Sequence, residues 1–247
     1  MPQPSDPSHP IPGTPPRRFY SAATPAPLEG GGHGVFLDGR PVRTPSRGPL
    51  TLPTAALAEA VAAEWAAQGE SVDPHSMPLT QLANTALERV VLGRAPLLAE
   101  VVRYVDADML CYRAEGPPDL VALQRQSWQP LLDWANETLG ASMAVTHGVM
   151  PVRQPDATVA ALRGALEVLD DWAFTAAQCA AGATHSVVLA LALVSARVDA
   201  ETCFALSRLD ETWQMERWGE DREALKAREA VRRDLVAAET LVRLTRG

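Results

Sequence analysis

The segment Leu206–Asp221, LSRLDETWQMERWGED, holds the side chains whose types and spacing best suit recognition chemistry. On a helix, Leu206, Leu209 and Trp213 would form one apolar stripe. A second stripe, spaced i, i+3, i+4 and i+7, combines a carboxylate, an amide, a thioether and an indole: Glu211, Gln214, Met215 and Trp218. Because Trp and Met offer adaptable apolar area and polar groups fix orientation, this second face suits noncovalent binding of another protein.

The same residues also allow a structural interpretation, in which Trp218 packs in the core and Glu211 pairs with Arg208 one turn back. Asp210 and Glu211 are adjacent carboxylates, but neighbours on a helix point about 100° apart. They therefore do not face one substrate as an acid/base pair. Asp221, at the end of the segment, joins the candidate partner-binding residues.

Patterns of catalytic residues are missing from the sequence. There is no GxxxxGK[ST] motif, and the run Gly30–Gly34 precedes a strand rather than a helix, so it cannot place a helix N-terminus against a phosphate. Ser186 is not in a GxSxG turn, and no histidine has zinc-ligand spacing to a cysteine or carboxylate. We therefore predict no catalytic residue, metal or cofactor, although an active site assembled from distant residues stays open.

The charge and composition of the chain exclude some classes of partner. The net charge is −8, which argues against a nucleic-acid-binding surface. The longest strongly apolar run, Val187–Val194, is too short to span a bilayer, so we expect no membrane insertion. The start of the chain has no apolar signal-peptide core. An odd set of cysteines in apolar surroundings, Cys111, Cys179 and Cys203, indicates free thiols in a reducing compartment, which predicts a cytoplasmic protein.

The elements that must position these residues fall into three parts. Residues 1–16 hold seven prolines and predict a disordered tail. Residues 17–76 predict a small β-rich domain with one helix. Its candidate strands are Phe19–Thr24, Val35–Leu37, Arg40–Thr44 and Leu50–Leu52. A type I′ turn at Asp38-Gly39 would join the second and third, with Pro41 on an edge.

Residues 77–247 predict a helical domain, so the fold class is α+β, a small N-terminal β-rich domain followed by a larger all-α domain. Capping and proline signals set the expected helices. Thr54 caps the helix of the first domain, and Pro78 and Pro96 open the next two. The others are Pro118–Leu139, a helix from Asp156 to Leu169, two buried helices Trp172–Ala181 and His185–Ala196, one from Asp199 to Trp218, and Glu223–Leu244. Met143–His147 is a strand or an extended connection.

Five stretches together resemble the Atp-twelve family, the chaperones that assist assembly of the catalytic head of the F-type ATP synthase. They are RRFYSAA, LDGRPVRTPSRGPLTLPT, AEWAAQGESVDPHSMPLTQLANTALERV, YVDADMLCYRAEGPPDLVALQRQSWQPLLDWA and LSRLDETWQMERWGED. They cover most of the chain from Arg17 to Asp221. The resemblance excludes the first 16 residues, which look unlike a mitochondrial transit peptide and so suggest a bacterial, cytoplasmic member with mitochondrial relatives.

The resemblance implies a partner, the free alpha subunit of the ATP synthase, and a protein that needs neither ATP nor metal. It implies that Glu211 matches the family's functionally important carboxylate, with Asp210 beside it in the same motif, and that Trp65 in AEW matches another required position. We expect Trp65 to be an interior aromatic whose role is stability. We also expect a monomer. The rival functions are a hydrolase with a scattered site and a permanent subunit of the finished complex.

Overall fold

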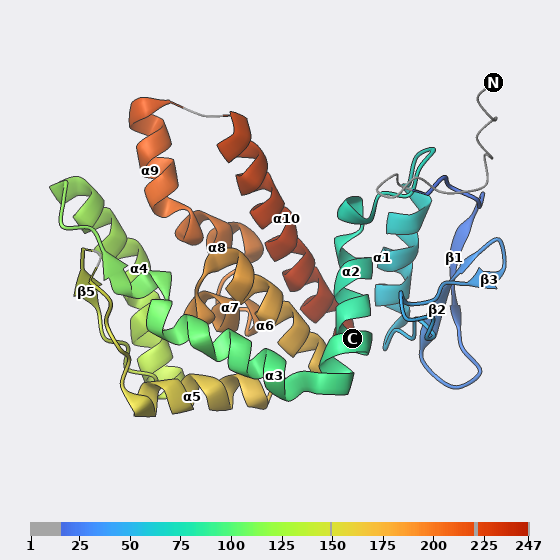
Figure 1. Ribbon diagram of the computed structural model, residues 1–247, viewed down its shortest axis with the longest axis horizontal. Coiled ribbons are helices and arrows are strands. Elements are labelled where there is room, and N and C mark those ends of the chain that lie inside the picture. Colours follow the sequence, from blue (N-terminus) through green and yellow to red (C-terminus); the bar gives the residue numbers. More distant parts are fainter. Residues whose placement is uncertain (1–15, 149, 220–221, 247) are drawn as a thin grey trace, which may run out of the picture. The chain divides into compact units, whose positions relative to one another are not determined.

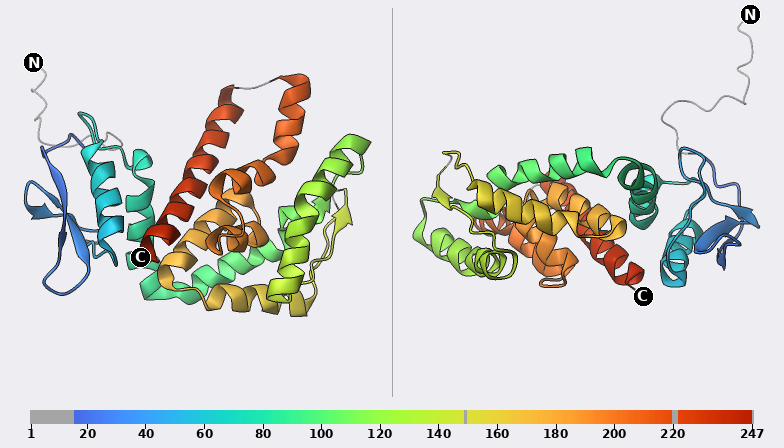
Figure 2. Two further views of the ribbon diagram at one scale, coloured as in Figure 1. Left: turned by 180° about the vertical axis from the view of Figure 1, so that it is seen from behind. Right: turned by 90° about the horizontal axis from the view of Figure 1, so that it is seen from below.

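The computed structural model describes residues 16–148, 150–219 and 222–246 (Figures 1 and 2). The chain divides into two compact units, Met1–Gln81 and Leu82–Gly247. A three-stranded sheet in the first and a series of helices in the second confirm the predicted α+β class. The predicted tail falls outside the described residues except for Pro16, whose carbonyl accepts a 2.8 Å hydrogen bond from the Val72 N–H.

The sheet is antiparallel, in the order β1-β2-β3. Its strands are β1 (Ala23–Pro27), β2 (His33–Leu37) and β3 (Arg40–Pro41). Asp38 and Gly39 have φ values of 47° and 81°, as a type I′ turn requires. Pro41 lies on the edge strand and pairs with Phe36, which confirms the predicted turn and pairing. The third strand is shorter than the predicted Arg40–Thr44, because Arg43 forms a separate bridge with Pro49.

The first strand was predicted too early, because the chain before Ala23 has other hydrogen-bond partners. The N–H groups of Ser21 and Ala22 donate to the Asp38 carboxylate at 3.0 and 2.9 Å, and Arg17 forms an isolated bridge with Ser71. The predicted strand Leu50–Leu52 is reduced to a bridge between Leu52 and His33.

Helix α1 (Ala55–Ala66) begins as predicted at Thr54, whose hydroxyl accepts from the Leu57 N–H at 3.1 Å. Its buried face packs against β1 and β2. On its other side Glu64 accepts from the N–H groups of Leu79 and Thr80, at 2.7 and 2.8 Å. These groups are in the first turn of α2 (Pro78–Thr85), after the 3₁₀ turn Pro74–Ser76, so α1 supplies the N-terminal cap of α2.

The second unit is built around α6 (Asp171–Thr184) and α7 (Val187–Val194). Every residue of α7 is buried, which confirms the predicted central helices. Figure 1 shows α3 (Val91–Val102), α5 (Asp156–Glu167), α8 (Ala200–Ser207) and α10 (Arg222–Thr245) around this pair. The unit also contains a π-helical turn Ala86–Val90, 3₁₀ turns Arg103–Ala107 and Met109–Cys111, α4 (Pro118–Leu139), α9 (Leu209–Trp218), and the parallel pair β4 (Tyr112–Arg113) and β5 (Thr146–His147).

Three of the predicted helices begin differently or are divided in the structure. Pro155 precedes α5 and no side chain caps that helix, because Asp156 is its first residue and pairs with Arg153 at 3.1 Å. Helix α3 begins before Pro96, with a non-helical bend at Gly93 (φ −163°, ψ 54°). The helix predicted from Asp199 to Trp218 is two helices, since Arg208 breaks it with φ −115° and ψ 21°.

Candidate functional site

The break at Arg208 sets the direction of α9. Its guanidinium reaches back to the end of α6, where Nη2 donates to the Ala183 carbonyl at 2.7 Å. Nη1 donates forward to Glu211 at 3.1 Å. One largely buried arginine therefore satisfies a carbonyl in the last turn of α6 and anchors the first turn of α9.

Glu211 bridges two arginines. Besides the Arg208 pair, its second carboxylate oxygen lies 3.2 Å from Arg228 Nη1 on α10. The two arginine side chains are 15% and 14% exposed, whereas that of Glu211 is 49% exposed. Arg228 also donates to the Thr212 hydroxyl at 2.9 Å and lies over the Phe204 ring. The Arg208 pair of the structural interpretation is present, and the partner-binding role of Glu211 stays a proposal.

Asp210 points the other way, into the fold. Gln124 on α4 donates to both Asp210 oxygens, at 2.8 and 3.0 Å, while its own Oε1 accepts from the Ala114 N–H. Gln124 is 1% exposed, and its carbonyl accepts from Arg113 at 2.7 Å. This network ties α9 to α4 and to the segment after β4, which supports a structural role for Asp210.

The two tryptophans of α9 have different environments. Trp213 is buried, donates from Nε1 to Asp119 at 3.3 Å, and is covered by the Arg217 guanidinium 3.7 Å above its ring. Trp218 contacts the Trp213 ring edge-on, with centroids 5.8 Å apart, but is 74% exposed. The interpretation of Trp218 as a core residue is wrong, because the end of α9 extends past α8 (Figures 1 and 2).

The remaining partner-binding candidates lie on the same helix. Gln214 is exposed and Met215 is half-buried, so both accompany Trp218 toward solvent. Asp221 lies outside the described residues. Helix α9 stops before Gly219, as predicted, although ψ of 173° places that glycine outside the left-handed helical region.

A groove of about 330 Å³ lies where α4, α8, α9 and α10 meet, on the side of α9 that carries Leu209 and Trp213, and we call it the α9 groove. Its apolar wall is formed by Leu123, Phe204, Leu209 and Trp213, and its polar rim by Thr212, Glu216 and Arg228. An apolar hollow with a polar rim has the composition of a protein-docking surface, and its wall residue Trp213 is the ring that Trp218 contacts.

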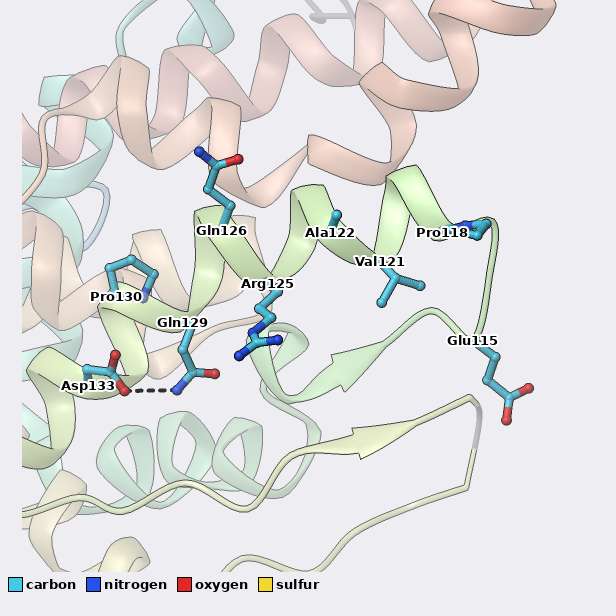
Figure 3. A pocket seen from close by; sticks show the side chains of 9 residues that line it. All are labelled: Glu115, Pro118, Val121, Ala122, Arg125, Gln126, Gln129, Pro130 and Asp133. Carbon is cyan, nitrogen blue, oxygen red and sulfur yellow. Dashed lines mark hydrogen bonds between the residues drawn. The ribbon is translucent and has the colours of Figure 1, made fainter.

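A second groove, of about 760 Å³, follows the outer face of α4 (Figure 3). Glu115 stands at one end of it and Asp133 at the other, where Asp133 accepts from Gln129 at 2.9 Å. Arg125 lies between them. Because these charged groups do not converge, this groove gives no support to a hydrolase site.

The cysteines do not provide a nucleophile. Burial raises the pKa of the Cys111, Cys179 and Cys203 thiols to about 12, so all three stay protonated at neutral pH. Within residues 16–148, 150–219 and 222–246, no cluster of His, Cys, Asp or Glu is placed to hold a metal ion. Across the same ranges, no helix combines the length and the apolar character that crossing a membrane requires.

Trp65, in the first unit, is half-buried rather than interior as predicted. Its carbonyl accepts from the Tyr20 hydroxyl at 2.7 Å, and the two rings lie 5.9 Å apart. The indole Nε1 is shielded from solvent and has no hydrogen-bond partner in the described chain. The contacts with Tyr20 attach the start of the fold to α1 and favour a role in stability.

We expect Glu211→Lys to lower the free energy of unfolding by about 1–2 kcal/mol, because it places a third cation between Arg208 and Arg228. Glu216→Lys is the matched control, with the same charge change on an exposed position of α9. Denaturant unfolding of both variants measures the difference. Equal stability of the two would contradict a structural bridge at Glu211.

Comparisons with known proteins agree on one family. A family model described as ATP12 chaperone protein matches residues 17–136. Protein atp12 of Schizosaccharomyces pombe mitochondria is 26% identical over 224 residues, 86% of this chain and 77% of that protein. The crystal structure of Atp12 from Paracoccus denitrificans has a TM-score of 0.84 and 42% identity, covering 93% of this chain and 98% of that one. A candidate chaperone from Agrobacterium tumefaciens has a TM-score of 0.86 and 39% identity, covering 96% and 92%.

Proposed function

Because this chain belongs to the ATP12 chaperone family, we propose that it binds the free alpha subunit of the F-type ATP synthase head during assembly. An unassembled ring subunit exposes an interface that the finished ring buries. Obligate interfaces of this kind are large and apolar, so the exposed surface favours aggregation. A chaperone that covers it lowers the concentration of the aggregation-prone species by mass action.

The exposure of Trp218 is the observation that carries this proposal. Tryptophan is enriched among interface residues with large binding energies, and the exposed Trp218 ring contacts Trp213 in the wall of the α9 groove. Gln214 and Met215 extend the same face. The bridges made by Glu211 and Asp210 hold α9 in place, so the binding face is preorganised before the partner arrives.

Release is as necessary as capture, because the alpha subunit must pass to the beta subunit. The α9 groove is small and its rim is polar, which favours a complex weaker than the ring interface that replaces it. We propose that this handover uses binding energy alone, without ATP, metal or catalysis, and that the protein acts as a monomer in the bacterial cytoplasm.

Co-expression with the alpha subunit tests the proposal. We expect alpha to stay soluble and to co-purify with this protein only when the beta subunit is absent. Alpha that is equally soluble with and without this protein, and never associates with it, would contradict the proposal. Stoichiometric retention in the purified ATP synthase would instead identify a permanent subunit.

A further inference from the structure

The first unit has a small apolar pocket against β2 and β3, the strands labelled in Figure 1, and we call it the Arg43 pocket. Its volume is about 280 Å³. The side chains that give it an apolar wall are Leu28, Val35, Pro41, Val42, Pro49 and Leu50. Among the described residues that line it, Arg43 alone is charged and none is aromatic. The pocket therefore combines an apolar interior with one guanidinium.

Arg43 belongs to a group of three exposed arginines, together with Arg40 and Arg47. Residues 40–50 contain these three arginines and no acidic residue. None of the three forms an ion pair with another residue of the described ranges. The neighbouring Asp38 carboxylate instead accepts from two backbone N–H groups at 3.0 and 2.9 Å, and Glu29 is exposed and also pairs with none of them. This surface thus offers cations that the fold itself does not neutralise.

Arg47 has an unfavourable backbone conformation. Its φ of 66° lies in the left-handed region, which glycine adopts more easily than any other residue. The turn around it depends on backbone and Thr44 groups: the Arg47 N–H donates to the Thr44 carbonyl at 2.8 Å, and the Gly48 N–H donates to the Thr44 hydroxyl at 3.1 Å. Glycine at position 47 would allow the same turn. An arginine there, with its side chain exposed and unpaired within the described chain, indicates a role outside the fold.

The geometry brings the two arginines of the pocket side together. Arg43 Nη1 donates to the Arg47 carbonyl at 3.0 Å, so the guanidinium of Arg43 lies at the backbone of the turn that carries Arg47. An arginine presents a planar fork of donors that binds a carboxylate through two hydrogen bonds. A guanidinium beside an apolar pocket therefore matches a carboxylate that neighbours an apolar side chain.

A protein segment fits this surface better than a nucleic acid does. Arginine also pairs with phosphates, but unpaired bases need aromatic rings on which to stack, and the described lining of the pocket has none. Nucleic-acid binding also depends on many phosphate contacts, and the rest of a chain with a net charge of −8 would repel a long polyanion. A short acidic segment needs only the local cations.

We propose that the Arg43 pocket binds a segment of the alpha subunit in which an apolar side chain adjoins acidic residues, a proposal that rests on the proposed function. The apolar side chain fills the pocket and is removed from water. One carboxylate pairs with Arg43 and a second with Arg47, which fixes the orientation of the segment, while Arg40 adds long-range attraction.

The first test measures the affinity of the full chain for purified alpha subunit. Arg43→Glu is expected to weaken capture about tenfold at an unchanged melting temperature. Arg103→Glu is the matched control, with the same charge change at an exposed arginine of the helical unit, and should capture alpha like the wild-type chain. Arg47→Gly removes a cation and relieves the left-handed strain, so it should weaken capture without lowering the melting temperature, a combination that a merely structural residue would not give.

The second test uses two acetylated and amidated peptides of equal charge, Glu-Glu-Leu-Glu and Glu-Glu-Ser-Glu, at millimolar concentration. NMR shifts of the amide of Gly34, which lines the pocket, report binding. The leucine peptide should shift this amide in the wild-type chain and in Arg103→Glu but not in Arg43→Glu, and the serine peptide should shift it less. Equal shifts by the two peptides, or none by either, would overturn the pocket.

The two tests separate this proposal from the proposed function. Capture of alpha that Arg43→Glu leaves undiminished, or that Arg103→Glu weakens as much, would overturn the binding of alpha at the Arg43 pocket while the proposed function stands. No capture by the wild-type chain would contradict the proposed function, and the peptides would still decide whether the pocket binds acidic segments. Binding of a poly(U) oligomer that is lost in Arg43→Glu would identify a nucleic-acid surface and overturn the proposal.

Discussion

Asp108→Asn is expected to lower the free energy of unfolding by about 3 kcal/mol. Asp108 is completely buried between the two 3₁₀ turns, and its side chain contacts the first turn of the fully buried helix α7. One carboxylate oxygen accepts from the Leu110 N–H and the other from the Val188 N–H, both at 3.2 Å. An asparagine has one acceptor oxygen, so its amide group would face a backbone donor and leave that donor unpaired.

The control for this variant is Asp199→Asn, at the exposed N-cap of α8, where Asp199 accepts from the Thr202 N–H at 2.7 Å. Asparagine caps helices as well as aspartate, so little change is expected there. Denaturant unfolding at pH 7 compares the two. If Asp108→Asn lowers the free energy of unfolding no more than Asp199→Asn does, the buried carboxylate does not stabilise the start of α7.

The stability contributed by Asp108 should also depend on pH. Burial raises the pKa of Asp108 to about 6, against hydrogen bonds from Ser186, Val188, Leu110 and Val187 that lower it, while the unfolded value is 3.8. The folded state therefore binds more protons between these two values, and stability falls as pH rises through that window. Asp108→Asn should therefore lower the free energy of unfolding by about 1 kcal/mol more at pH 5 than at pH 7.

Local signals along the chain predicted most of the fold. Thr54 caps α1, Asp38-Gly39 turns the hairpin, and α4 begins at Pro118 and ends at Leu139, because each signal acts within one or two turns of backbone. The elements that were predicted wrongly depend on hydrogen bonds to residues far away in the sequence. Helix α9 separates from α8 because Arg208 bonds to Ala183, 25 residues earlier, and no periodicity could show this.

The candidate site shows the same division between local and distant interactions. The i, i+3 spacing of Arg208 and Glu211 predicted their ion pair. The second pair, with Arg228 on α10, joins residues 17 positions apart and has no local signal. Helical spacing could not show whether Trp218 is buried or exposed, because its burial depends on where the neighbouring helix α8 ends.

Trp218→Ala should weaken capture of the alpha subunit about 30-fold, a loss of about 2 kcal/mol of binding free energy. The ring is 74% exposed and touches Trp213 only edge-on, so its removal should change the free energy of unfolding by less than about 0.5 kcal/mol. Binding measured with purified alpha subunit, together with denaturant unfolding, separates the two effects.

The matched control is Leu92→Ala, at a leucine that is 79% exposed elsewhere in the helical unit. If exposed apolar area alone promoted capture, both variants would lose affinity in proportion to the area removed. If α9 forms the binding face, only Trp218→Ala loses affinity for the alpha subunit, because binding energy is concentrated in a few preorganised side chains. Equal affinity of Trp218→Ala and the wild-type chain, at unchanged stability, would remove α9 from the interface and leave Glu211 with its structural role alone.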